Sequence, residues 1–186
     1  MYHISKDARA RRSAELICDG LESCLKEKPL NKIRVCDVYE RSTVSRATFY
    51  RLFDGIQDVF AYACDKIRTD IMEAVKKLSF PSKRDHVLYC MQRWLAHEPL
   101  MKALVDNNLY GIFFESHMRN ADILKQLYSI PAEDECKFEC FASILASLTY
   151  AALSVYFRRR DNESLEEVYR TICSCTEHIS NSFVKI

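Results

Sequence analysis

Apolar residues recur every three or four positions along most of the chain, which is the pattern of amphipathic helices. The first such stretch covers about residues 6–28 and ends before a proline. A short helix containing Val35, Val38 and Tyr39 is expected next, with Asn31 as its cap. The pattern therefore predicts two consecutive helices at the N-terminus.

Ser45 is expected to cap a third short helix that runs to about Phe53. Phe49 and Phe53 lie four residues apart, so they share the inner side of this helix. A long helix is expected to begin at Asp54 or Gly55. Its buried face is predicted to comprise Val59, Ala63, Ile67, Ile71 and Ala74.

Pro81 lies in a linker-like stretch, and the chain then returns to helical periodicity. We expect five further helices, at about 83–97, 99–107, 109–128, 134–159 and 163–184. The sequence therefore predicts an all-α protein of about nine helices. It divides into a helix-turn-helix domain, residues 1–54, and a larger helical domain, residues 55–186.

Composition supports this prediction. The 186 residues include only 3 Gly and 4 Pro, so the tight turns of β-hairpins are scarce. Residues of the hydrophobic class make up 48% of the chain, enough to build a core without disulfides or metals. No uninterrupted apolar run approaches about 18 residues, and the charged N-terminus has no signal-like apolar region. A cytoplasmic protein without a membrane segment is expected.

The cysteines, nine in number, form no C-x-x-C pair. Cys136 and Cys140 lie one helical turn apart and are a candidate half of a metal or redox site. Reduced thiols at apolar helix positions are the favoured interpretation, because such thiols behave as small hydrophobes. No catalytic motif is present. We therefore expect no cofactor, no metal and no enzymatic activity.

The net charge is only +1, but its distribution is uneven. Residues 1–60 hold 11 basic and 9 acidic side chains, and residues 61–186 hold 16 and 17. Four basic residues against one acidic residue give the first twelve positions a net +3. This distribution permits nucleic-acid binding without requiring it.

The third helix carries polar side chains opposite its phenylalanines, as expected of the recognition helix of a helix-turn-helix. Ala47 is small enough to let the backbone approach base edges, and Arg46 can bind guanine O6 and N7. Hydroxyl and guanidinium groups suit phosphate oxygens. The candidates for phosphate binding are Ser45, Thr48, Tyr50 and Arg51.

The stretch IRVCDVYERSTVSRATFYRLFDGIQDVF, residues 33–60, resembles the signature of the tetracycline-repressor (TetR) family of transcriptional regulators. The matching positions are Val44, Ser45, Ala47, Thr48, Phe49, Tyr50 and Phe53. The resemblance covers about residues 8–62. It implies a homodimer that binds a near-palindromic DNA operator through N-terminal three-helix domains. The C-terminal domain would dimerise and bind a small effector.

The family pattern also implies which residues contact DNA. On the recognition helix these are Ser45, Arg46, Ala47, Thr48, Tyr50 and Arg51. Arg9, Arg12, Lys32, Arg34 and Thr43 are the implied flanking phosphate contacts. Thr43, Leu52 and Ile56 stand where the family often has glycine, histidine and lysine. The D-G-I-Q-D-V-F form resembles a subgroup with D-I-x-D-L at the start of its fourth helix.

The last two helices are expected to form the dimer interface through Ala151, Val155, Val168, Ile172, Cys175 and Ile179. The alternative is that this seam packs only within the subunit. The middle helices supply aromatic side chains that either line an effector pocket or fill the core. The candidate pocket residues are Met91, Trp94, Tyr110, Phe113, Phe114, His117, Phe141 and Tyr150. They would suit a small apolar or aromatic effector.

The sequence therefore favours a ligand-responsive repressor that acts as a homodimer on double-stranded DNA. The alternative is a helical protein-interaction module or co-activator that keeps this fold without binding an operator. The apolar Leu52 and Ile56 support the alternative, because the family is often basic at these positions.

Overall fold

The structure, a computed structural model, describes residues 2–5, 7–119, 121, 124–125, 128 and 134–183. The predicted all-α class is confirmed, since these residues form nine α-helices, one short 3-10 helix and no strand. In chain order the elements are α1 (Ala8–Glu27), η1 (Leu30–Lys32), α2 (Val35–Arg41), α3 (Arg46–Leu52), α4 (Ile56–Lys77), α5 (Lys83–Leu95), α6 (Glu98–Asp106), α7 (Tyr110–Arg119), α9 (Glu135–Arg159) and α10 (Leu165–Phe183).

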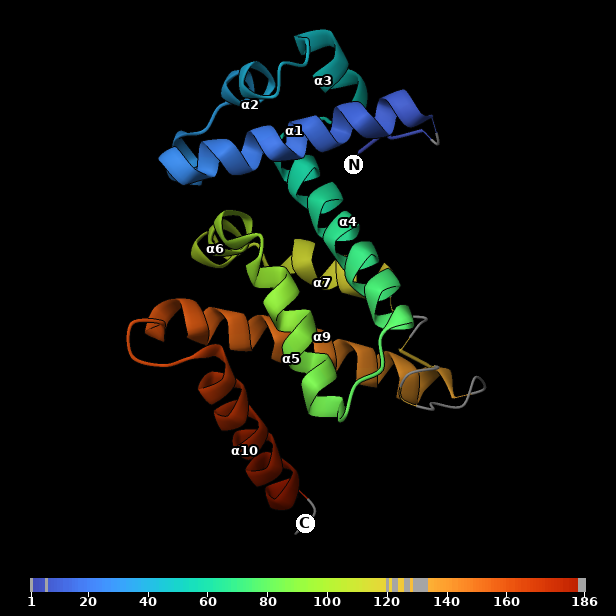
Figure 1. Cartoon of the computed structure of the whole chain (residues 1–186), viewed down its shortest axis with the longest axis vertical. Coiled ribbons are helices and arrows are strands. Elements are labelled where there is room, and N and C mark those ends of the chain that lie inside the picture. The colour runs from blue at the N-terminus through green and yellow to red at the C-terminus, as the bar shows by residue number, and fades with distance from the viewer. Residues whose placement is uncertain are drawn as a thin grey trace.

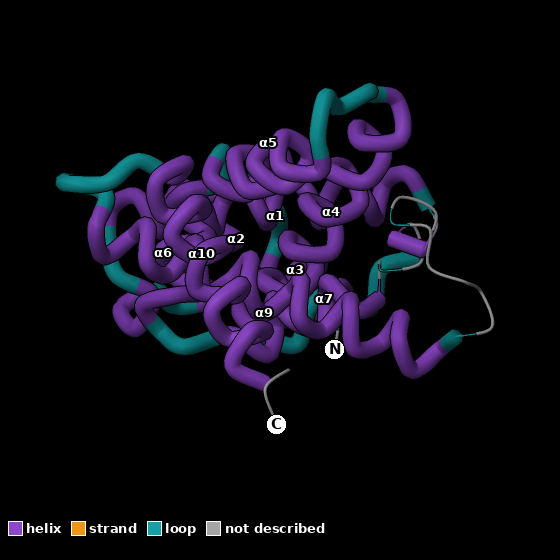
Figure 2. Tube along the Cα trace, turned by 90° about the horizontal axis from the view of Figure 1, so that it is seen from below, coloured by secondary structure: helices purple, strands orange, loops and turns teal. Residues whose placement is uncertain are grey.

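The helices α1, α2 and α3 gather at one end of the molecule, and the remaining helices extend away from them (Figure 1). α4 runs from α1 into the larger part, where α5, α6, α7 and α9 pack together. α10 follows α9 at the opposite end from α3. The view from below, down the long axis, shows helices joined by loops in the described part of the chain (Figure 2). The second half of the predicted 109–128 helix lies mostly outside the described residues.

α1 and α2 cross closely at Gly20. A Cβ atom at this position would lie 2.8 Å from the Val38 carbonyl oxygen and 2.9 Å from the Ser42 Cβ. Glycine is therefore required here by the approach of two backbones. This crossing fixes α2 against α1 and so sets the platform on which α3 rests.

The turn between α2 and α3 is built by backbone hydrogen bonds. Ser42 N donates to the Val38 oxygen at 3.0 Å, and Val44 N donates to the Tyr39 oxygen at 3.2 Å. Between them Thr43 adopts a φ of 57°. This left-handed conformation is strained for a β-branched residue, which explains why the TetR pattern often has glycine here.

The observed helix ends match only some of those predicted from the sequence. Ser45 caps α3 as predicted, since its side chain accepts a hydrogen bond from Thr48 N. The prediction of Asn31 as the cap of α2 is wrong, because Asn31 lies inside η1 and α2 begins after Arg34. The Asp37 carboxylate instead accepts from Arg34 N at 2.7 Å, closing the first turn from within.

α4 is buried along one face for most of its length. Of the predicted core positions, Val59, Ala63, Ile67 and Ile71 are buried, while Ala74 is half-buried and its neighbour Val75 takes the core position. The apolar core that α4 joins extends from α1 to α7 and α9 without a break. The two parts of the molecule are therefore joined by shared packing.

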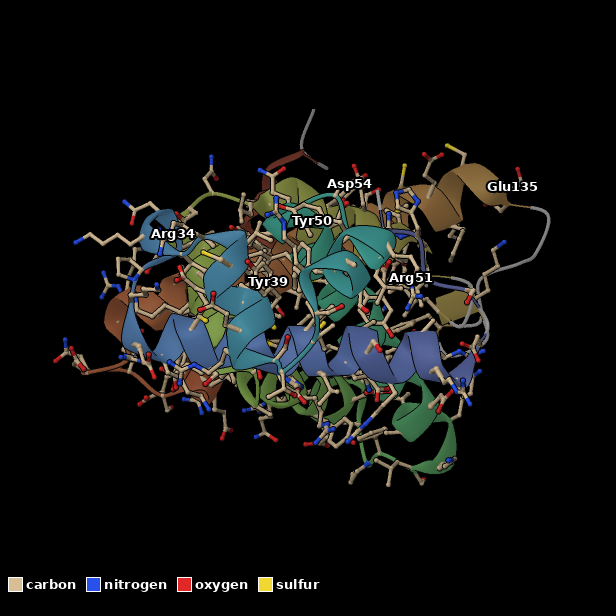
Figure 3. All side chains as sticks on the ribbon, turned by 90° about the horizontal axis from the view of Figure 1, so that it is seen from above. Arg34, Tyr39, Tyr50, Arg51, Asp54 and Glu135 are labelled. Carbon is tan, nitrogen blue, oxygen red and sulfur yellow. The ribbon has the colours of Figure 1, made fainter. Side chains whose placement is uncertain are left out.

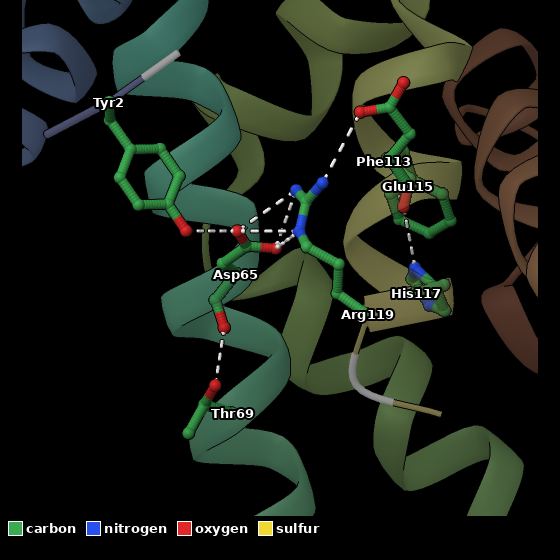
Figure 4. A network of polar contacts seen from close by, with 7 residues as sticks. All are labelled: Tyr2, Asp65, Thr69, Phe113, Glu115, His117 and Arg119. Atoms are coloured by element: carbon green, nitrogen blue, oxygen red, sulfur yellow. Dashed lines mark hydrogen bonds and ion pairs between the residues drawn. The ribbon is translucent and has the colours of Figure 1, made fainter. Parts of the chain in front are cut away.

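A polar network links the N-terminal segment to α4 and α7 (Figure 4). The Tyr2 hydroxyl donates to Asp65 Oδ2 at 2.6 Å, and Arg119 Nη2 lies 3.0 Å from the same oxygen. Thr69 donates its hydroxyl to the Asp65 carbonyl oxygen at 2.8 Å. Asp65 thus holds three segments of the chain together.

α9 is long and apolar enough to cross a membrane by length and composition alone. Core and interface helices of folded domains meet the same criterion. In this chain Ala142, Ala146, Ala152 and Leu153 are buried against neighbouring helices, while Ile144 on another face is 58% exposed. α9 therefore has one face in the core and one uncovered face.

The α1–α2 crossing leads to a stability prediction. Gly20→Ala should lower the free energy of unfolding by about 1–3 kcal/mol, because the added methyl group meets backbone atoms. Gly111→Ala is the matched control, since a Cβ atom there has nothing within 4 Å. It should instead raise stability by about 0.5–1 kcal/mol, because alanine favours the helix. Urea unfolding of both variants measures the difference, and equal stabilities would contradict the close crossing.

The strained turn leads to a second prediction. Thr43→Gly should stabilise the protein by roughly 0.5–1 kcal/mol, because glycine adopts the left-handed conformation without a Cβ clash. Thr43→Ala keeps the Cβ atom and should change stability little. Thermal unfolding of the two variants tests this difference. A Thr43→Gly variant less stable than Thr43→Ala would show that the threonine conformation is not strained.

Candidate nucleic-acid interface

The outer face of α3 is polar and open, while its inner face is fixed in the core. Phe49 and Phe53 are fully buried, with ring centroids 5.9 Å apart, and Leu52 is 2% exposed. Arg46 and Arg51 lie on the exposed side. The apolar anchors therefore hold α3 at a fixed orientation and direct its cationic side chains outward.

Arg46 and Tyr50, one turn apart on α3, contact each other. The Arg46 guanidinium lies 5.7 Å from the centroid of the Tyr50 ring, within range of a cation–π interaction. Tyr50 is 48% exposed, and its ring meets the buried Phe49 ring edge-on at 5.5 Å. The buried Phe49 ring thus contacts the Tyr50 ring, and the Tyr50 ring in turn contacts the Arg46 guanidinium. Ala47 is exposed beside them and leaves the helix backbone accessible.

Ser45 and Thr48 bond to each other at the start of α3. The Ser45 oxygen accepts from Thr48 N at 3.1 Å, and its hydroxyl donates to Thr48 Oγ1 at 3.0 Å. The Ser45 proton is thereby used inside the helix turn. The Thr48 hydroxyl proton keeps its capacity to donate to an outside acceptor.

The flanking basic residues are all exposed but differ in their charge environment. Arg34 Nη2 lies 3.6 Å from Asp37 Oδ1, and Arg12 Nη1 lies 3.9 Å from Glu15 Oε2. Lys28 Nζ, 2.7 Å from the Asp37 carboxylate, and the backbone N–H of Arg34 hold the pKa of Asp37 down at about 2. Asp37 therefore stays ionised and offsets part of the charge of Arg34.

Four other basic residues differ from Arg34 and Arg12 in having no ion pair with a described carboxylate. Within the described part of the chain no ion pair engages Arg9, Lys32, Arg46 or Arg51. Seen from above α3, Tyr50 lies between Arg34 and Arg51 across this face (Figure 3). The face therefore presents cationic side chains on both sides of a central tyrosine, which suits a polyanion.

The two apolar departures from the TetR pattern have different environments. Leu52 packs in the core, so it offers no surface to a protein partner. Ile56 is half-buried at the first position of α4. Asp54 N donates to Asp58 Oδ2 at 2.9 Å beside it, which caps this helix start with a carboxylate. The start of α4 is thus acidic where the TetR pattern often has a lysine.

The candidate pocket residues do not line one common cavity. Trp94 and His117 line a small cavity between α4, α5 and α7, and Met91 lines a neighbouring one. The rest are ring contacts in the helical packing, such as Phe113 against Trp94 with centroids 4.9 Å apart. Contacts of this kind also join Tyr110 to Phe114 and Tyr150, and Phe141 to Tyr128.

The candidate dimer residues differ in how far their side chains are exposed. Val168, one of the predicted interface residues, is buried within the subunit at 1% exposure. Ile172 and Val155 are half-buried, while Ala151, Cys175 and Ile179 are exposed. The seam predicted on α10 therefore packs within the subunit on one side and is open on the other.

Comparisons with known proteins were made at the levels of sequence and structure. No protein-family model and no curated protein sequence matches this chain. Solved structures do match over nearly its full length. Lin0861 from Listeria innocua has a TM-score of 0.68 at 17% identity, covering 95% of this chain and 96% of that one.

Two further structural matches are proteins that act on gene expression. The TetR family repressor AlkX from Dietzia sp. strain DQ12-45-1b has a TM-score of 0.56 at 19% identity, covering 93% of this chain and 96% of that one. The dihydroxyacetone kinase operon activator DhaS has a TM-score of 0.53 at 17% identity, with 88% and 93% covered. The chain therefore shares the overall fold of these three proteins.

Proposed function

We propose that this protein is a DNA-binding transcriptional regulator that acts as a homodimer on a near-palindromic operator. The observation that carries the proposal is the outer face of α3. Arg46, Tyr50 and Arg51 are exposed there on a helix anchored by buried aromatic side chains, in a TetR-like fold. A solvated surface helix has no need of a supported tyrosine that stacks on an arginine.

In this function α3 enters the major groove and Ala47 allows the backbone to approach the base edges. Arg46 binds guanine O6 and N7 through its two-pronged guanidinium. The Thr48 and Tyr50 hydroxyls and the Arg51 guanidinium bind phosphates. Ser45 acts mainly by ordering the first turn of α3, since its hydroxyl group donates its hydrogen bond to Thr48 Oγ1.

The flanking contacts come from elements on either side of α3. The N-terminal end of α1 supplies Arg9 and Arg12, η1 and the following loop supply Lys32 and Arg34, and the turn supplies Thr43. All five are exposed. Phosphate contacts of this kind fix the register of the protein on DNA without reading sequence.

The homodimer is assigned to the uncovered faces of α9 and α10. Ile144 and Ala151 lie two helical turns apart on α9, and the first is 58% exposed. Ile179 on α10 is 55% exposed. Apolar side chains in these positions favour burial against a second copy related by a twofold axis. Two α3 helices held in this way would read half-sites at least one helical turn (~34 Å) apart.

We further propose that the regulator is a ligand-responsive repressor in the cytoplasm and not an enzyme. A small effector would bind in the larger helical part and shift α4, so that the two α3 helices no longer fit the operator. The support is the continuous core that joins α4 to both parts of the chain.

The competing function is a protein-interaction module or co-activator that uses the same surface without an operator. Leu52 no longer supports it, because the core covers its side chain. Ile56 remains partly accessible. Salt separates the two functions, since log affinity for DNA falls linearly with log salt by about 0.9 for each phosphate neutralised. An apolar protein contact depends only weakly on salt.

Fluorescence anisotropy with the DNA upstream of the protein's own gene tests operator binding. Tyr50→Ala should weaken binding by roughly tenfold or more, because it removes a phosphate contact and the support of Arg46. Tyr50→Phe keeps the ring and should retain the sequence preference while losing the phosphate contact. Arg46→Ala should cost about 1–3 kcal/mol and relax the preference over scrambled DNA.

Lys76→Ala is the control for the binding experiment, since Lys76 is exposed near the far end of α4. It should leave the affinity and its salt dependence unchanged. Arg51→Ala should reduce the salt slope by about 1, as the loss of one phosphate contact requires. Absence of binding to any DNA at low salt would contradict operator binding and favour the protein-interaction function.

The dimer is tested by Ala151→Glu. The new carboxylate would be buried next to its symmetry mate, so the dimer dissociation constant should rise by roughly a hundredfold or more. Gln92→Glu adds the same charge to an exposed position of α5 and should have no effect. Sedimentation velocity measures both variants. A monomeric wild-type protein, or a dimer insensitive to Ala151→Glu, would contradict the assigned interface.

A further inference from the structure

Arg68, in the middle of α4, is buried in the larger helical part. Its side chain is 3% exposed, and its Nε and Nη2 atoms are enclosed without a hydrogen-bond partner in the described part of the molecule. A buried guanidinium without acceptors is unfavourable, and such groups are normally paired. Arg68 therefore has donors in the interior that no described residue uses.

Among the described residues, the titratable groups around Arg68 supply no negative charge. Burial, and after it the charge of Arg68, lowers the pKa of His86, and the same causes lower the pKa of His117 well below its usual range. Burial raises the pKa of Cys90 to about 11 and that of Tyr128 to about 12. All four are therefore neutral at pH 7. Arg68 remains a cation, since burial lowers its own pKa only to about 10.

Arg68 lines a small cavity of about 20 Å³ together with Trp94, His86 and His117. The indole Nε1 of Trp94 is also buried and has no acceptor among the described residues. Donors from α4 and α5 thus line the same space, and none of the described residues that line it is a carboxylate. Such a space suits a group that only accepts hydrogen bonds, and its size is that of about one water molecule.

A second cavity of about 100 Å³ adjoins the first. The two share the lining residues Val87, Leu145 and Thr149. The second cavity lies between α5, α9 and α10, where Met91, Leu148 and Ile172 make its walls largely apolar. The first cavity, lined by polar donors, and the second, largely apolar cavity therefore lie side by side.

We propose that this paired cavity binds an organic carboxylate, with the carboxylate on Arg68 and Trp94 and the apolar body between α5, α9 and α10. The proposal rests on the proposed function for its regulatory meaning, but the binding itself is independent of DNA. The carboxylate would supply the bidentate acceptor that a guanidinium prefers. Entry requires the shared side chains to separate, so that the two cavities become one.

Octanoate is the probe for the first test, with 1-octanol as the uncharged analogue and inorganic phosphate as an anion without an apolar body. Trp94 is the single tryptophan of the chain, so its fluorescence reports the site directly. Octanoate at a hundredfold its Kd should change this fluorescence and raise the Tm by roughly 5–10 °C. No response to octanoate would overturn the proposal. A response to octanol or phosphate as large as that to octanoate would overturn the amphipathic assignment.

Arg68→Met tests whether the guanidinium is the binding group. Without octanoate this variant should be at least as stable as the wild type, because it removes a buried, unpaired charge. Its affinity for octanoate should fall by roughly a hundredfold. A lower Tm for Arg68→Met without ligand would show that the folded chain itself uses the charge, which would overturn the proposal.

Arg93→Met is the matched control, because Arg93 is exposed on α5. It should bind octanoate as the wild type does. The DNA titration is performed separately and without octanoate. If the protein binds octanoate but no DNA, the proposed function alone is refuted. If it binds DNA but not octanoate, this inference alone is refuted.

Discussion

The burial of one continuous face of α4 is the constraint on which the structure depends. Val59 packs in the same hydrophobic core as α1, and Ile71 packs in that core twelve residues later. Because packed interiors resist small displacements, α4 cannot tilt at one end without moving its contacts at the other. The polar network at Asp65 adds a second connection from the N-terminal segment to α7.

Most of the fold could be predicted because the helices are long and periodic. The bounds of α1, α9 and α10 and the start of α4 fall within about two residues of those expected, and Ser45 marks the start of α3 correctly. The failures are local. The start of α2 depends on an Asp37 carboxylate that accepts a hydrogen bond from the backbone N–H of Arg34. Pro29, two residues before Asn31, gave no sign of the short η1 turn that follows it.

The candidate site was predictable to a different degree in each part of the chain. On α3, inward phenylalanines and outward arginines follow from sequence spacing, so exposure there could be anticipated. The interior of the larger part depends on packing between helices distant in sequence. Val168 looks like a seam residue in the sequence, but in the structure its side chain is buried within the subunit. Arg68 follows the apolar Ile67 and resembles a solvated helix position until α5 and α7 enclose it.

The position of Arg68 on α4 gives a ligand there a direct mechanical route to α3. Twelve residues separate Arg68 from Ile56, which is about 18 Å of helix. A ligand shifts an equilibrium only by its differential affinity for the two states. Here the difference arises because the enclosed cavity leaves the guanidinium without an acceptor, whereas an opened one would pair it. The cost of an unpaired buried charge in the closed state thus becomes the energy available for moving α4, and with it the platform that holds α3.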